Sequence, residues 1–162
     1  MDSCSDQDNP SIDLPSIDED TGHMLVHYLY TSTYQTLDNL DPCTVDERSI
    51  EFKRAVSAYS IGGVYQLSGL QQLAMGKIEC LGDKLHTFDI FNTIDNEFPK
   101  LLDDDNWFCN YLKERAKATF KENPTLCTDH TFLDRISNVD LNKILVKCIM
   151  ELYSAIVLGE PS

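Results

Sequence analysis

The chain has 162 residues and a formal net charge of −14, and 42 % of its residues are hydrophobic. This length accommodates one domain with a sizeable core and is short for two. Residues 1–47 hold eleven Asp and Glu and no Lys or Arg. This part of the chain would repel phosphate backbones, so nucleic-acid binding is not expected.

The sequence predicts neither a membrane segment nor a disulfide framework. Its most apolar stretch, Ile144–Leu158, is too short for a membrane span and is interrupted by Lys147 and Glu151. A basic start followed by an apolar run, the mark of a signal peptide, is absent. The six cysteines are scattered without a C-x-x-C pair. We therefore expect a cytoplasmic or nuclear protein with reduced thiols and no membrane association.

The first third of the chain predicts an acidic lead, a short strand and one helix. Residues 1–11 are polar and acidic and are expected to be disordered. A strand is expected near 12–14, and Asp18 or Asp20 is a natural N-cap for the helix that follows. That helix carries apolar side chains at helical spacing, namely Leu25, Tyr28 and Leu29.

The next segment predicts two helices on either side of a glycine pair. A loop is expected over 35–47, and Ser49 is expected to open the first helix. Gly62 and Gly63 should bend or end it early, because each glycine inside a helix costs about 1 kcal/mol relative to Ala. Ser68 is a good N-cap for the second helix, and Gly82 is its stop.

The chain stays helical by pattern beyond residue 85. Short amphipathic elements are expected over 88–98, 107–120 and 132–136, and Asp140 is expected to cap a last, longer helix. The apolar surface of this last helix is so wide that we expect several helices to bury it. The fold class is therefore mainly α, with at most one or two short strands near the N-terminus.

Two segments resemble the second half of a BTB/POZ domain of the divergent fungal type. Ile12-Asp-Leu-Pro15 leads to a helix containing Tyr28-Leu-Tyr-Thr31, and Tyr59-Ser-Ile-Gly62 precedes Leu70-Gln-Gln-Leu73-Ala74. In that family an "IDLP" strand leads to a helix ending in "Y-L-Y-T" and then to a helix pair. The resemblance divides the chain into an acidic lead, a partial BTB/POZ-like region and a helical C-terminal extension packed on it, at 1–11, 12–85 and 86–162.

The resemblance implies a non-catalytic protein–protein interaction module, acting as an adaptor or an oligomerisation unit. Its implied partners are a second copy, another protein or, as in some members, a cullin-type ubiquitin ligase scaffold. The first half of the family's domain has no counterpart here, so the chain is either a natural half-domain or a fragment of a longer protein. Apolar side chains that this half would cover form the candidate interface, and either the helix over 141–158 or a second chain would cover them: Met24, Leu25, Ile50 and Val56.

The competing interpretation is a small helical metal-binding protein or enzyme centred on His23 and His27. These residues are four apart on one predicted helix, so both rings could face a metal ion. Zinc needs further ligands, no acid lies between the two as in H-E-x-x-H, and Cys43 is a candidate only if the fold brings it near. No catalytic nucleophile, phosphate loop or cofactor site is predicted, and Asp103-Asp-Asp105 fits a helix start better than a calcium loop.

Helical faces predict which side chains share a core. Trp107, Phe108 and Tyr111 fit a helix core better than an exposed binding patch. One core should also gather residues from the first three helices, namely Tyr28, Leu29, Phe52, Val56, Tyr59, Leu70 and Leu73.

The cysteine pattern yields a test. All six should be free thiols in the native protein, because neither their spacing nor the expected compartment favours bridges. Alkylation of the unfolded chain without reductant should modify six sites by mass analysis, and a reproducible shortfall of two would contradict the expectation.

Overall fold

A computed structural model describes residues 17–37, 42–95, 106–125, 134 and 136–158. In these residues the regular structure is helical, which confirms the mainly α fold class. The expected strand at 12–14 and the Asp103-Asp-Asp105 run lie outside the described residues, as does most of the element expected over 132–136. The helices are α1 (Glu19–Thr31), α2 (Val45–Val64), α3 (Ser68–Gly82), α4 (Thr87–Ile94), α5 (Asn106–Glu122) and α7 (Val139–Leu158).

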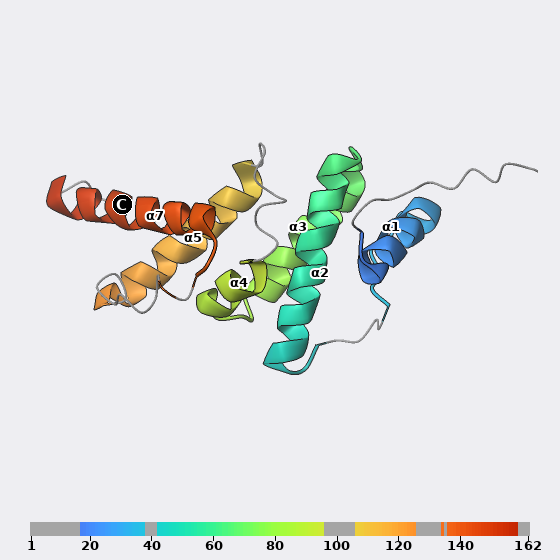
Figure 1. Cartoon of the computed structure of the whole chain (residues 1–162), viewed down its shortest axis with the longest axis horizontal. Helices are drawn as coiled ribbons and strands as arrows, with labels where there is room; N and C mark the ends of the chain where they lie inside the picture. Colours follow the sequence, from blue (N-terminus) through green and yellow to red (C-terminus); the bar gives the residue numbers. More distant parts are fainter. Residues whose placement is uncertain (1–16, 38–41, 96–105, 126–133, 135, 159–162) are drawn as a thin grey trace, which may run out of the picture.

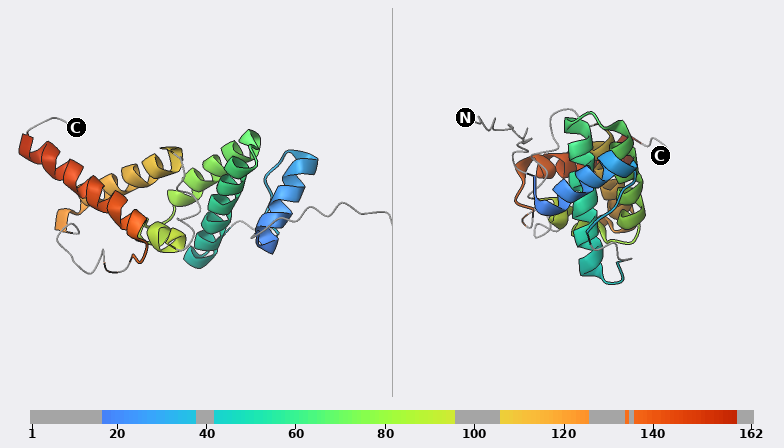
Figure 2. Two further views of the ribbon diagram at one scale, coloured as in Figure 1. Left: turned by 45° about the horizontal axis from the view of Figure 1, so that its top comes forward. Right: turned by 90° about the vertical axis from the view of Figure 1, so that its right-hand side faces the viewer.

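The helices follow one another along an elongated molecule (Figures 1 and 2). The α2 and α3 helices form an antiparallel pair in the middle, α1 packs on one side of α2, and α4 packs on α2 from the other direction. The α5 and α7 helices pack together at the end farthest from α1. The acidic start of the described chain and its last helix therefore lie at opposite ends.

Side-chain caps determine where the first two helices begin. The Asp18 carboxylate accepts a hydrogen bond from the backbone N–H of Thr21 at 2.8 Å, which confirms Asp18 as an N-cap. Thr44 and Glu47 form a reciprocal capping box, in which each side chain accepts from the other residue's backbone N–H. Because of this box α2 begins at Val45, so the loop expected up to residue 47 ends earlier than predicted.

The glycine pair lets α2 and α3 approach closely. A Cβ at Gly62 would lie 2.9 Å from the backbone nitrogen of Gln71, closer than real contacts allow. The helix runs through both glycines to Val64, and Gln66 then reverses the chain with a φ of 56°. The glycines therefore serve packing, and α2 does not end at them.

Two other expected caps are wrong. Ser68 is the first residue of α3 rather than its cap, and the N-cap Leu67 makes no side-chain hydrogen bond. At α7 the Asn138 side-chain oxygen accepts from the N–H groups of Asp140 and Leu141, both at 3.0 Å. Asn138 is in turn held to the end of α4 by Asp95, whose carboxylate accepts from its N–H at 2.8 Å.

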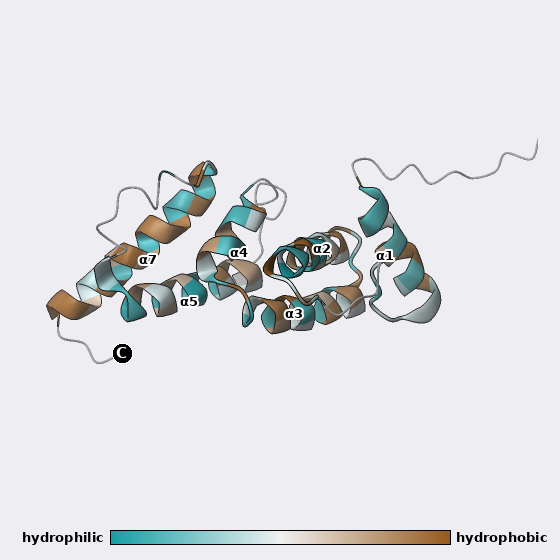
Figure 3. Ribbon diagram, turned by 90° about the horizontal axis from the view of Figure 1, so that it is seen from below, coloured by the Kyte–Doolittle hydropathy of each residue, from teal (hydrophilic) through white to brown (hydrophobic). Residues whose placement is uncertain are grey.

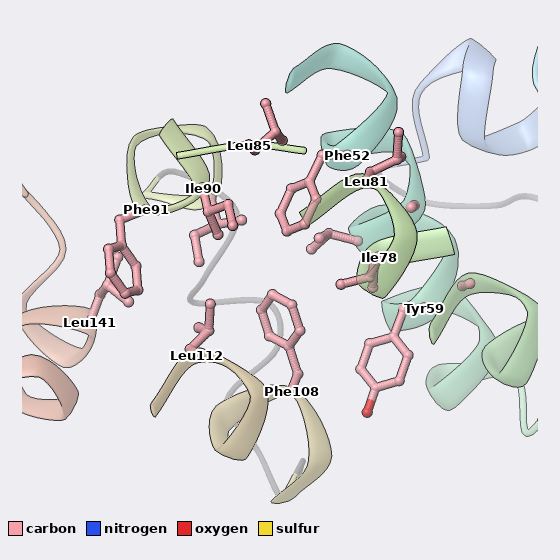
Figure 4. Packing of buried hydrophobic residues seen from close by; sticks show 14 of the residues in the cluster. Phe52, Tyr59, Ile78, Leu81, Leu85, Ile90, Phe91, Phe108, Leu112 and Leu141 are labelled. Carbon is pink, nitrogen blue, oxygen red and sulfur yellow. The ribbon is translucent and has the colours of Figure 1, made fainter. Parts of the chain in front are cut away.

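A single hydrophobic core runs through the middle of the molecule (Figure 4). Phe52, Val56, Tyr59 and Leu70 are buried as expected, and the core continues into the second half of the chain through Ile78, Phe91, Phe108, Leu112 and Leu141.

Leu29 and Leu73 were assigned wrongly to this core, since they are 60 % and 42 % exposed. The face that α3 turns inward is instead formed by Leu70, Ala74 and Ile78, at four-residue steps.

The burial pattern of α3 predicts a contrast between two leucines three residues apart. Leu70→Ala should lower the free energy of unfolding by about 2–5 kcal/mol, because it opens a cavity in the core. Leu73→Ala should cost less than about 1 kcal/mol, because much of its side chain is already in water. Urea unfolding of both variants measures the difference, and equal losses would refute this assignment of the α3 faces.

Candidate interaction surface

The four residues of the candidate interface do not form an exposed patch. Met24, Leu25 and Val56 are at most 5 % exposed, whereas Ile50 is 53 % exposed. The packing of α1 against α2 and of α2 against α3 buries the first three within the single chain. The C-terminal helix is not their cover, because α7 packs on α5 at the far end of the molecule (Figure 1).

The α1–α2 contact also contains a charged cluster. Arg54 of α2 pairs with Asp20 of α1 at 2.8 Å and with Glu51 of its own helix at 2.5 Å. The Tyr34 hydroxyl is buried beside this cluster, and burial together with the Glu51 carboxylate raises the pKa of Tyr34 above its usual range. The ion pairs of Arg54 fix α1 on α2, and its guanidinium lies beside both the Asp20 and the Glu51 carboxylates.

His23 and His27 lie side by side on α1, with ring centroids 6.2 Å apart. The Nε2 atom of His27 lies 3.0 Å from the Thr33 hydroxyl oxygen, within hydrogen-bond distance. Among the described residues, no cluster of three or more His, Cys, Asp or Glu could hold a metal ion. Cys43 does not complete such a cluster, so the described residues give the metal interpretation no support.

An arginine attaches α5 to the end of α3. The Arg115 guanidinium donates to the carbonyl oxygens of Gly82 and Leu85 and pairs with the Asp83 carboxylate at 3.1 Å. A cation at a helix C-terminus is favourable, because the last carbonyl groups of a helix lack intrahelical partners.

Aromatic rings join α5 to α2 beside this arginine. The Trp107 and Phe108 rings lie 5.2 and 6.0 Å from Tyr59. Phe108 is fully buried, and Trp107 and Tyr111 are half-buried, as expected for a core rather than a binding patch. A Cβ at Gly82 would overlap the Tyr111 hydroxyl, so the tyrosine side chain would have to shift to admit a larger residue there. Burial raises the pKa of Tyr111 to about 12, against the opposing effect of Arg115.

Among the described helices, α7 carries the most exposed large apolar side chains, and hydrophobic residues recur along its ribbon (Figure 3). The α5 helix covers one side of α7, where Leu141, Leu145 and Cys148 are buried. The adjacent side is 41–78 % exposed, and we call it the α7 face; it consists of Val139, Val146, Met150, Tyr153, Ile156 and Val157.

The spacing of apolar residues in the sequence predicted the wide apolar surface of α7, but it also predicted that several helices would bury this surface. In the described structure α5 is the main neighbour of α7, so the α7 face remains exposed to solvent.

The α7 helix carries four charged side chains whose charges cancel. Asp140, Lys143, Lys147 and Glu151 give α7 no net formal charge, in a chain of −14. The last three lie at four-residue steps along one edge of the α7 face, and Glu151 contacts Lys117 of α5 at 3.3 Å. The α7 face thus has a charged edge on a locally neutral helix. None of the described helices is long and apolar enough to cross a membrane.

Two family models together match nearly the whole chain. The model of the HAC6 N-terminal domain matches residues 1–85, and that of the HAC6 small helical domain matches residues 86–158. Subtelomeric hrmA-associated cluster proteins from two Aspergillus fumigatus strains are each 26 % identical over 149 residues. These residues are 91 % of this chain but 38 % of each relative, so the chain spans well under half of their length. No solved structure matches.

The BTB/POZ resemblance is therefore wrong, because the matching models are the two HAC6 models and no BTB/POZ model matches. Apart from the short run Ile12-Asp-Leu-Pro15, the similarity consisted of tyrosines and leucines at helical spacing, which amphipathic helices of many families share. The glycine pair at Gly62 and Gly63, where the BTB pattern has Ala-Asp, reflects the close α2–α3 contact of this fold.

The Arg115 contacts predict an effect on stability. Arg115→Ala should lower the free energy of unfolding by about 1.5–3 kcal/mol, because it removes charge-assisted hydrogen bonds to partly buried carbonyl groups. Asp83→Ala should cost less than about 1 kcal/mol, because that carboxylate is largely exposed. Lys121→Ala, at the exposed end of the same helix, is the control. Urea unfolding compares the three, and similar losses in all of them would contradict the attachment role of Arg115.

Proposed function

The chain belongs to the HAC6 family, through the N-terminal domain and the small helical domain of that family, and on this premise we propose that it is a non-catalytic protein–protein interaction module. The observation that carries the proposal is the α7 face, an apolar strip on one exposed helix. Monomeric proteins rarely leave contiguous apolar surface of this kind uncovered unless something binds it.

The composition of the α7 face supports a protein as its ligand. Met150 and Tyr153 lie at its centre, and both residue types are enriched in the cores of protein interfaces. The charged row along one edge resembles the polar rim that surrounds such cores. A helix that presents anchors at three- and four-residue steps suits docking against another helix or a groove.

The remaining polar clusters are accounted for by internal packing. Arg54 fixes α1 on α2, and Arg115 fixes α5 on α3. The curated relatives are much longer than the aligned region, so their further segments and their own partners are outside this proposal.

Site-specific photo-crosslinking tests the proposal. A photoreactive amino acid at position 150 should form adducts with protein in the cells that produce the chain, because that position lies at the centre of the α7 face. The same group at position 29 is the matched control, since Leu29 and Met150 are 60 % and 64 % exposed. No protein adduct at position 150, or equal adducts at both positions, would reject the α7 face as a docking surface.

A further inference from the structure

We propose that the partner of the α7 face is a second copy of this chain, bound through the same face with the two α7 helices antiparallel. This inference rests on the proposed function, because it names the occupant of the same surface.

The exposed area is of the size that a stable dimer needs. With about 150–200 Å² of surface for each large apolar residue, the exposed fractions of the α7 face amount to roughly 600–800 Å². Stable interfaces of standard size take about 600–1,000 Å² from each partner. The α7 face alone approaches that range, without a contribution from any other helix.

The charge distribution favours a second copy at this position. Asp18, Glu19 and Asp20 lie at the start of α1, and α1 lies at the end of the described molecule farthest from α7. Two chains of charge −14 repel each other, and pairing through α7 keeps the acidic start of α1 in one chain far from that of the other. The α7 helix itself adds no net charge to the contact.

The charged edge of the α7 face determines the orientation. In a symmetric parallel pair the charged edges of the two helices would lie on opposite sides of the contact, so Lys143, Lys147 and Glu151 would not meet their counterparts. An antiparallel pair brings the lysine half of one helix toward the Glu151 half of the other, and flanking charges of this kind set helix orientation in coiled coils. The same arrangement places Met150 opposite Tyr153 and Val146 opposite Val157.

Self-association of the purified chain is the first measurement. Light scattering after gel filtration at micromolar concentration should give twice the mass of one chain. Met150→Asp and, separately, Tyr153→Asp should each weaken dimerisation at least about tenfold, with an unchanged helical circular dichroism spectrum. Leu29→Asp is the matched control and should leave the dimer intact. A monomeric wild-type chain, or a dimer that only Leu29→Asp disrupts, would overturn the inference.

Crosslinking within the purified protein tests the orientation. A photoreactive group at position 157 should attach to the tryptic peptide 144–147 of the second copy. Attachment to the peptide 148–162 would indicate a parallel pair and overturn the antiparallel arrangement.

The two proposals fail separately. If position 150 forms adducts in cells only with a different protein, the second copy is wrong while the interaction module stands. If it forms no protein adducts at all, the proposed function fails with it.

Discussion

The close contact between α2 and α3 is the constraint on which the rest of the structure depends. At Gly62 the two backbones approach so closely that any Cβ would meet the backbone of Gln71. This approach lets Phe52, Val56 and Tyr59 of α2 interlock with Leu70, Ala74 and Ile78 of α3. The resulting pair offers α1 a surface on one side and α4 a surface on the other. A bulkier residue at position 62 would therefore disturb contacts on both sides of the molecule.

The second half of the chain is attached through the end of α3. Gly82 leaves room for the Tyr111 hydroxyl, and Arg115 satisfies the carbonyl groups of Gly82 and Leu85. Asp95 and Asn138 then connect the end of α4 to the start of α7. The Arg115 contacts lie close to residue 85, where the two family models meet, whereas Asp95 and Asn138 both belong to the region of the second model. The Arg115 contacts connect the regions matched by the two models, together with the hydrophobic core that both regions share.

Acidic residues and exposed apolar residues lie at opposite ends of the described molecule, and this separation bears on function. The acidic first turn of α1 lies at one end of the described molecule, while the exposed apolar residues lie on a helix without net charge at the other end. Such a separation lets apolar association proceed where electrostatic repulsion is smallest. The self-association proposed for the α7 face uses this separation.

The sequence by itself determined the helical class, a cap at Asp18 or Asp20, the helix end at Gly82 and most of the core of α2, because capping and apolar periodicity act over a few residues. Helical spacing alone could not decide that Leu70 faces inward while Leu73 and Leu29 face water, since all three fit an apolar stripe. The buried state of Met24, Leu25 and Val56 and the open state of the α7 face also depend on which helices lie beside them. Only the tertiary structure decided these points, because burial is a property of neighbours distant in the chain, and short patterns shared by many helical families do not specify those neighbours.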